Sequence, residues 1–279
     1  MTAQTITLAH HTSPRRGALA AALRDSWLVA QRDMAHWIRE PQLIVWGLLF
    51  PIAFVLLFAY VLGSGMIVPG GGSYREFLMP GIFAQTMAFG IGETIAAVHA
   101  DTSRGVTDRM RSMPLSPVAV VAGRSIANTV YSALSLLLLV GCGLVIGWRW
   151  HGTLIEAAAG FGLLLWLRIA FLWVGIYLGL KATSAEMANG IYGLLYPMTM
   201  LSNAFVSTEL MPDWLAIVAD WNPISATITA TRDLFGNPGV PGAGTWIGDH
   251  ATLMAIAWPA AITALTLPLA VRAFARLSR

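Results

Sequence analysis

The sequence predicts an all-α integral membrane protein, on three observations. Of the 279 residues, 56% are hydrophobic and only 11% are charged, whereas a soluble domain carries about 25% charged residues. The mean hydropathy is +0.66. The apolar residues also gather into six runs, each close to the roughly 20 residues that a helix needs to cross the hydrocarbon of a bilayer. This number of charged residues is too small to cover the surface of a water-soluble protein of this length. Most of the surface must therefore face lipid.

The N-terminal part is predicted to be cytoplasmic and to lie outside the bilayer core. Residues 1–17 are polar and read as a flexible tail. Within 18–40, apolar residues recur at spacings of three and four with charged residues between them: Leu19, Leu23, Trp27, Ala30, Met34 and Trp37. This pattern indicates an amphipathic helix in the headgroup region. A short soluble helix packed on a partner is the alternative, and Pro41 ends or bends the helix in either case.

The remaining domain, 41–279, is predicted to hold six spans, near 43–62, 78–98, 126–146, 157–180, 187–206 and 251–271. Between the last two lies a segment, 207–250, that is too polar to span and too apolar to be a linker. It predicts short broken helices that dip into the outer leaflet. Glycines spaced i, i+4 within spans favour close helix packing or dimerisation, and prolines within spans can kink them: Gly143, Gly147, Gly175 and Gly179, and Pro51, Pro197, Pro259 and Pro268.

The basic residues set the orientation. With the N-terminus inside, the outer segments hold only Arg75, Arg149 and Arg232, and Arg168 lies within a span. The inner segments hold all the others: Arg15, Arg16, Arg24, Arg32, Arg39, Arg104, Arg109, Arg111, Arg124, Lys181, Arg272, Arg276 and Arg279. Cytoplasmic segments carry an excess of Lys and Arg. We therefore expect a multi-pass protein of the plasma membrane with both termini in the cytoplasm.

Two ionisable residues fall within predicted spans. Arg168 is near the middle of the fourth span, and Glu93 lies toward the inner end of the second. Their depths differ by about 6 Å at 1.5 Å per residue, which is within reach of an arginine side chain. One interpretation is a polar patch on a solute path. The others are a structural ion pair, or an arginine that snorkels into the inner leaflet.

Several function classes lack their motifs. The chain has no Gly-x-x-x-x-Gly-Lys-Ser/Thr run for a nucleotide, no His/Cys cluster with metal spacing and no arguable Ser-His-Asp set. The outer acidic residues are scattered over about forty positions rather than grouped as in a membrane enzyme. We expect no catalytic residue, no metal, no resident cofactor and no nucleic-acid partner.

The stretch 101–117 is the polar interruption between the second and third spans. Asp101 or Thr102 can cap a helix start, and Pro114 and Pro117 close it. The residues between them place three apolar side chains on one face, while charged side chains make another: Val106, Met110 and Met113, and Arg104, Asp108 and Arg111, with Arg109 beside them. A short Met-rich amphipathic helix suits docking into a groove on a partner. An ordinary basic juxtamembrane loop fits the spacing equally well.

Two blocks of sequence resemble type 2 ABC exporter permeases, in particular the daunorubicin/doxorubicin-resistance permeases of actinobacteria. The first runs Met-Pro-Gly-Ile-Phe-Ala-Gln-Thr from Met79, then through 101–117 to Gly123-Arg124. The second contains Ser-Ala-Glu at 184–186, Leu-Ser-Asn-Ala-Phe-Val from Leu201, Met-Pro-Asp-Trp at 211–214, Trp-Asn-Pro at 221–223 and Arg-Asp-Leu-Phe-Gly-Asn-Pro-Gly at 232–239. The likeness covers nearly the whole chain after about residue 18.

The resemblance implies a six-span permease that works as two permease copies, or with a similar permease, and with two separate ATPase subunits that bind ATP and Mg²⁺. It implies that the loop carries the coupling helix, with Asp101, Arg104, Val106, Asp108, Arg109, Met110, Arg111 and Met113 at the ATPase contact. It also implies that broken helices close the outer side, with Trp214, Trp221, Asn222, Pro223 and Arg232 as the outer gate. Arg168 matches no motif of the family.

The function expected is ATP-driven export of an amphipathic drug, antibiotic or lipid-like solute. A secondary carrier or channel that needs no ATPase, using Glu93 and Arg168, is the alternative, and an ATPase gene next to this one would favour the exporter. A membrane-integrated enzyme would need catalytic groups that the sequence does not offer.

Overall fold

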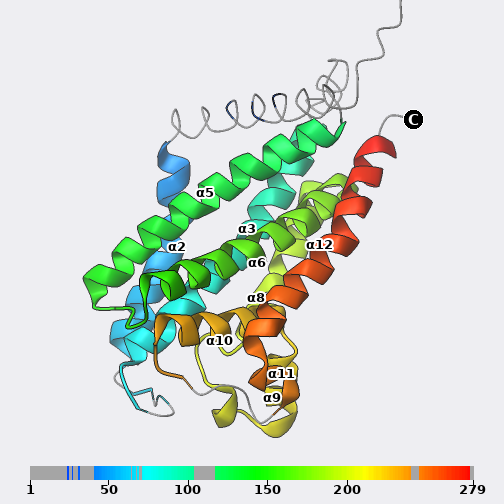
Figure 1. The fold of residues 1–279 in the computed structure, drawn as a ribbon. Helices are drawn as coiled ribbons and strands as arrows, with labels where there is room; N and C mark the ends of the chain where they lie inside the picture. Colours follow the sequence, from blue (N-terminus) through cyan, green and yellow to red (C-terminus); the bar gives the residue numbers. More distant parts are fainter. Residues whose placement is uncertain are drawn as a thin grey trace, which may run out of the picture.

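The computed structural model describes residues 24, 27, 31, 41–63, 65–66, 68, 71–103, 117–239 and 245–276. Regular structure in these ranges is helical throughout (Figure 1). Four helices there are long and apolar enough to cross a membrane: α3 (Tyr74–Ser103), the Ser125–Ile146 part of α5 (Pro117–Ile146), α6 (Leu154–Lys181) and α12 (Ala251–Arg276). The all-α class is thereby confirmed, and four of the predicted spans are apolar helices of spanning length.

The two other predicted spans are helical but built differently. Residues 43–62 fall within α2 (Pro41–Leu56) and its π-helical continuation η1 (Leu57–Leu62). Residues 187–206 divide into α7 (Ala185–Gly193) and α8 (Leu195–Met200), with a break at Leu194 and turns from Leu201 onward. Pro197 explains the break, because it has no N–H to donate to the carbonyl of Gly193 four residues earlier.

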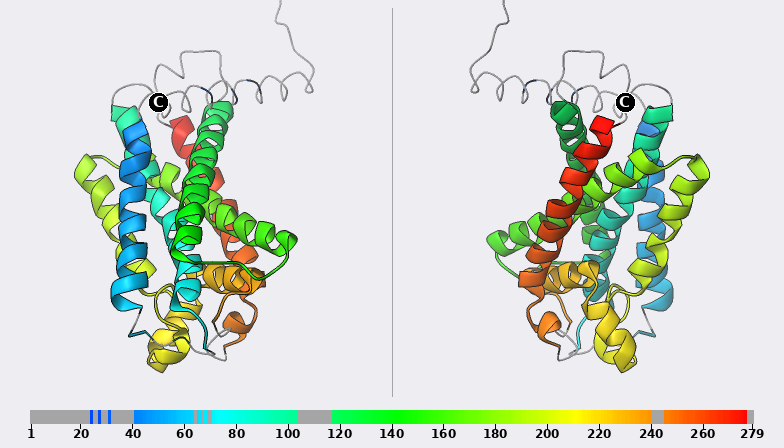
Figure 2. Two further views of the ribbon diagram at one scale, coloured as in Figure 1. Left: turned by 90° about the vertical axis from the view of Figure 1, so that its left-hand side faces the viewer. Right: turned by 90° about the vertical axis from the view of Figure 1, so that its right-hand side faces the viewer.

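Short helices gather at one end of the bundle, which we call the α10 end. They are η2 (Thr208–Leu210), α9 (Asp213–Asp220), α10 (Pro223–Phe235) and α11 (Trp246–Asp249). Figures 1 and 2 show them at the end opposite the C-terminus, with α12 running between the two ends. The described parts of the segment predicted to be too polar to span, 207–239 and 245–250, therefore fold onto one end of the bundle.

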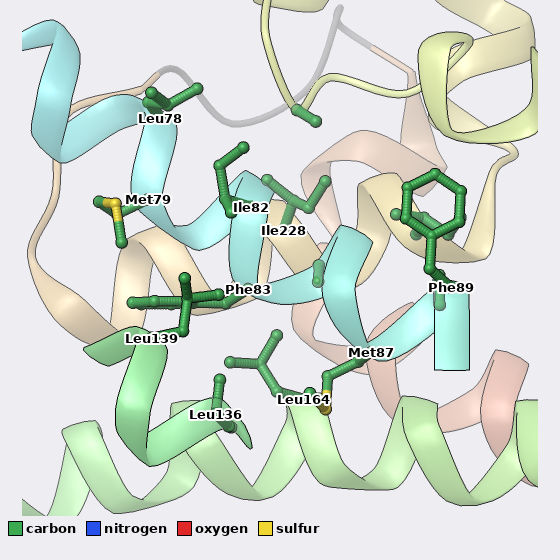
Figure 3. Packing of buried hydrophobic residues seen from close by; sticks show 14 of the residues in the cluster. Leu78, Met79, Ile82, Phe83, Met87, Phe89, Leu136, Leu139, Leu164 and Ile228 are labelled. Atoms are coloured by element: carbon green, nitrogen blue, oxygen red, sulfur yellow. The ribbon is translucent and has the colours of Figure 1, made fainter. Parts of the chain in front are cut away.

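Helix α3 is the centre of the core. Its buried side chains include Phe83 and Met87, and residues of three other helices pack around them: Leu136 and Leu139 from α5, Leu164 from α6 and Ile228 from α10 (Figure 3). Helix α6 lies alongside α3 over much of its length. Phe83 packs edge-on against Trp148, with ring centroids 5.2 Å apart. The core thus joins the long helices to the α10 end.

Two of the spaced glycines explain how closely α6 approaches α3. A Cβ at Gly175 would lie 2.9 Å from Cβ of Thr94, and one at Gly179 would lie 2.8 Å from Cβ of Val98. Small residues at i, i+4 permit such contact. This pair serves packing within the chain.

The predicted tail 1–17 lies outside the described residues, as does most of the predicted amphipathic helix 18–40. The three residues of that helix that are described, Arg24, Trp27 and Gln31, are helical and exposed.

Candidate functional site: an aromatic pocket and the network that closes the α10 end

A cavity of about 300 Å³, the aromatic pocket, opens between α2, α3, α5, α7 and α8. Its wall includes four rings from four of these helices: Phe50, Phe89, Tyr192 and Tyr196. The centroid of Phe89 lies 4.9 Å from that of Tyr196 and 6.0 Å from that of Tyr192. Phe50 stands edge-on to Tyr196 at 6.3 Å. The rings therefore form one connected group, which is the kind of lining that holds the apolar part of a small molecule.

The polar part of the wall comes from α3 and α5. Tyr131, Ser132 and Ser135 supply hydroxyls from successive turns of α5, and Glu93 supplies a carboxylate from α3. The Glu93 side chain is exposed. A wall that joins aromatic rings to hydroxyls and a carboxylate suits an amphipathic ligand better than a purely apolar one.

Arg168 is buried behind this wall, with 1% of its surface exposed. Its Nε donates to Oγ of Ser132 at 2.7 Å, and its Nη2 donates to Oγ1 of Thr94 at 3.2 Å. Its Nη1 has no hydrogen-bond partner. The guanidinium lies directly against Gly90, where a Cβ would come within 2.6 Å of Cζ. Arg168 therefore ties α6 to α5 and α3, and does not snorkel to a membrane face.

The structure places Glu93 and Arg168 in one neighbourhood without joining them. Arg168 bonds to hydroxyls, and these two described side chains make no ion pair with each other. Their charges still attract one another through space. Sequence reasoning found both charged residues but missed Gly90, Thr94 and Ser132. Small and hydroxyl residues are common in membrane helices, so no signal in a single sequence singles these out.

At the α10 end, Arg232 holds three segments together. Its Nε donates to the carbonyl of Phe77 at 3.0 Å, and its Nη2 donates to the carbonyls of Asn203 and Ala204 at 2.9 and 3.2 Å. Its Cζ also lies 3.6 Å from the centroid of the Phe77 ring. Burial lowers the pKa of the Arg232 guanidinium to about 9, against the opposing effect of Tyr74 and then Asp233. The side chain is thus charged at neutral pH, and the three carbonyl oxygens that accept its hydrogen bonds stabilise that charge.

Two asparagines extend this arrangement, which we call the Arg232 network. Asn203 donates through Nδ2 to Oγ1 of Thr229 at 2.7 Å. The side chain of Asn222 accepts from the backbone N–H of Ile224, so it caps α10 just before Pro223, and its Nδ2 donates to the carbonyl of Met198 at 2.8 Å. The network binds the end of α8 and the loop after it to α10.

The remaining predicted gate residues differ in environment. Trp214 and Trp221 belong to α9 and its C-terminal cap, and 68% and 56% of their surfaces are exposed. Trp221 lines a mainly apolar groove with Ile217 and Met198. The two tryptophans therefore lie on the surface of the α10 end, whereas Asn222 and Arg232 are buried inside it.

Sequence reasoning missed a further link at this end. Nε1 of Trp148, which is fully buried, donates to Oδ1 of Asn237 at 2.8 Å, and Nδ2 of Asn237 donates to the carbonyl of Arg149 at 2.7 Å. The loop between α5 and α6 is thereby fixed to the turn after α10. Asn237 belongs to the block 232–239, and the family resemblance of that block was the signal that could have identified it.

The predicted coupling residues are described only in part. Asp101 lies in the last turn of α3. Arg104, Val106, Asp108, Arg109, Met110, Arg111 and Met113 lie outside the described residues. Within the described ranges, no group of three or more His, Cys, Asp or Glu side chains could hold a metal ion.

Comparison with known proteins adds a family to this geometry. Residues 24–235 match the model of the ABC-2 type transporter. The chain is 29% identical over 258 residues to the daunorubicin resistance ABC transporter permease protein DrrB1 of Streptomyces coeruleorubidus, covering 92% of this chain and 89% of that protein. It is 23% identical to the probable doxorubicin resistance ABC transporter permease protein DrrC of Mycobacterium tuberculosis H37Rv, over 83% and 84% of the two chains. The putative transport permease YvfS of Bacillus subtilis is 24% identical, over 68% and 77%.

Proposed function

Because the chain belongs to the ABC-2 type transporter family, it is a multi-pass membrane subunit of an ABC transporter, and we propose that it exports an amphipathic solute. The solute would be a drug, an antibiotic or a lipid-like molecule. The aromatic pocket carries this proposal, since its wall combines aromatic rings, hydroxyls and a carboxylate between helices that come from different parts of the chain. The drug resistance for which two relatives are named supports the same class of solute.

Energy for export would come from outside this chain. The family works with ABC ATPase subunits, and we propose two of them, which bind ATP and Mg²⁺, together with a second copy of this permease or a similar one. In the membrane, α2 with η1 would be the first of six spans, and α7 with α8 the fifth. Both termini would be cytoplasmic, so the α10 end would face outward and the Arg232 network would close the outer side.

The connection between α3 and α5 suggests how the ATPase would act on the pocket. Helix α3 ends at Ser103 and α5 begins at Pro117, so the predicted coupling segment joins these two helices directly. Both line the aromatic pocket, through Glu93 on α3 and Ser132 on α5. Movement of the segment by a closing ATPase pair would therefore displace two walls of the pocket at once, as in other transitions driven by rigid elements.

The test is a substitution on the predicted docking face. Met110→Asp places a charge where an apolar contact with the ATPase is expected, so solute-stimulated ATP hydrolysis and export should both be abolished. Met110→Leu keeps the apolar face and should retain most of both activities. The measurement is ATPase activity and solute uptake into inside-out proteoliposomes that contain this chain and its ATPase, with membrane insertion checked separately. Full export by the Met110→Asp protein would contradict the proposal that Met110 docks on the ATPase.

One observation favours a second candidate, a secondary carrier. Glu93 is exposed toward the pocket and has no ion-pair partner in Arg168, so it could load and release a proton during transport. Proteoliposomes with this chain alone decide the matter. Uptake driven by a pH gradient without ATPase or ATP would support the carrier and overturn the exporter, and uptake only with both would support the exporter.

A further inference from the structure

The two charges at the aromatic pocket differ in their access to a ligand. Glu93 lines the cavity and is exposed. The Arg168 guanidinium is 1% exposed, packs against Gly90 and donates to the hydroxyls of Ser132 and Thr94. A ligand in the cavity can therefore touch the carboxylate but not the guanidinium. The carboxyl group of Glu93 faces the ligand, and the guanidinium of Arg168 is held behind the wall.

The rings reinforce this preference. Phe89 lies within 6.5 Å of each of Phe50, Tyr192 and Tyr196, measured between ring centroids, so the four rings form one cluster in the wall of the cavity. The face of an aromatic ring carries partial negative charge and attracts cations, quaternary ammonium groups above all. Ring faces and a carboxylate therefore favour the same ligand charge.

The size of the cavity limits what enters it. About 300 Å³ is near the lower end of the range for small-molecule sites. Phe50 and Tyr196 are 43% and 37% exposed, so the pocket is open where α2 faces α8. A head group with one ring fits inside, and the rest of a longer amphiphile would extend through that opening.

We infer that the aromatic pocket binds the cationic head of an amphipathic amine, with Glu93 as the counter-charge and Phe50, Phe89, Tyr192 and Tyr196 as the cage. The inference rests on the proposed function, because it names the class of solute that the exporter would take. An anionic solute would have to reach Arg168, which Gly90, Ser132 and Thr94 cover.

The test compares two probes that differ only in charge: benzyltrimethylammonium and neopentylbenzene, its uncharged carbon isostere. Binding of each to the full chain in nanodiscs is measured by equilibrium dialysis, with uptake by empty nanodiscs subtracted. The unaltered chain should bind the ammonium about tenfold more tightly than the isostere, a difference of about 1.4 kcal/mol. Glu93→Gln, which keeps the shape of the side chain, should remove that preference and leave binding of the isostere unchanged.

Two further variants control the result. Glu76→Gln removes a carboxylate from the same helix outside the pocket, where it bonds to His151, and should leave binding of both probes unchanged. Tyr196→Leu removes one ring face and should weaken ammonium binding by about threefold, as expected for a partly exposed cation–π contact. Tyr196→Phe keeps the ring and should not weaken it.

Equal affinities of the unaltered chain for the two probes would overturn the cation site, as would an undiminished preference in Glu93→Gln. Should Glu93→Gln fail to fold, the comparison of Tyr196→Leu with Tyr196→Phe decides in the same way. The exporter proposal fails separately. Charge-selective binding without ATP-dependent uptake in proteoliposomes would keep the cation site and remove export. ATP-dependent uptake of both probes to the same extent would keep export and remove the cation site.

Discussion

Arg168 is the residue at which three helices meet, since its backbone belongs to α6 and its guanidinium binds hydroxyls on α5 and α3. Moving an unpaired charge into an apolar interior costs several kcal/mol. A lone arginine in a membrane helix is tolerated where it faces the interior of the bundle and finds polar partners. Ser132 and Thr94 supply those partners, so they should contribute to the stability of the fold as well as to the shape of the pocket.

Thr94 allows this contribution to be measured against a matched control. Thr94 and Thr102 both donate to the carbonyl four residues earlier in α3, but only Thr94 accepts a hydrogen bond from Arg168. We expect Thr94→Val to lower the free energy of unfolding by about 2 kcal/mol, the cost of losing a hydrogen bond to a buried charged group. Thr102→Val should change it by much less. Denaturant unfolding in detergent micelles measures both, and equal losses would contradict the role of Arg168.

At the residue scale, the sequence predicted the charged members of the site and not their neighbours. Glu93 and Arg168 could be identified because ionisable residues within apolar spans are rare. Gly90 and Ser132 could not, because their importance depends on which helix lies opposite. Their position beside Arg168 becomes evident only when α3, α5 and α6 are brought together.

At the scale of elements, the close approach of α6 to α3 depends on the absence of two side chains. Gly179 faces the carbonyl of Ile95 at 2.9 Å and Cβ of Val98 at 2.8 Å, measured from the position that a Cβ would take. The carbonyl of Ile95 belongs to the backbone of α3, which cannot move aside for an added Cβ as the end of a flexible side chain can. The spacing of Gly175 and Gly179 predicted close packing, and the structure adds which helix provides it.

Substitution of that glycine gives an element-scale prediction. Gly179→Ala should push α6 away from α3 and destabilise the protein by about 1–3 kcal/mol, as overpacking of a core does. Gly162→Ala on the same helix is the control, since nothing lies within 4 Å of a Cβ there. Thermal unfolding in detergent should show a lower midpoint for Gly179→Ala alone. If both variants unfold at the same temperature as the unaltered chain, the glycine contact is not limiting.

The break between α7 and α8 marks the limit of prediction at this scale. Hydropathy treats 187–206 as one span, because it averages over residues and ignores which carbonyls are already bonded. Pro197 was a visible signal for a kink. Near the end of α8 at Met200, the carbonyls of Met198 and Leu201 accept hydrogen bonds from Asn222, which lies in another part of the sequence.

At the scale of the whole molecule, the α10 end is fixed to the bundle by contacts between distant segments. Arg232 joins α10 to α3 and to the loop after α8, and Asn237 joins the turn after α10 to the loop between α5 and α6. The resemblance to a family suggested that this end forms a closure. The residues that fix it could not be derived from hydropathy or spacing, because each bond links segments that are far apart in the chain.

The orientation of the molecule can be tested with single cysteines. Cys142 is the only native cysteine, so a Cys142→Ala background removes unwanted labelling. Asp213 on α9 and Lys181 at the end of α6 are both exposed. With the α10 end outside, a membrane-impermeant maleimide should label Asp213→Cys in intact cells and Lys181→Cys only after permeabilisation. The opposite pattern would place the α10 end in the cytoplasm and contradict the charge-based orientation.

The short helix α8 gives one further consequence. Tyr196 in α8 faces the aromatic pocket, and the carbonyl of Met198, two residues later, holds the side chain of Asn222 at the base of α10. The short helix α8 therefore contacts both the pocket and the α10 end. A coupling free energy between two sites acts equally in both directions. If a bound molecule favours the closed α10 end by some factor, opening of that end must lower the affinity for the molecule by the same factor, so release would accompany opening without a separate signal.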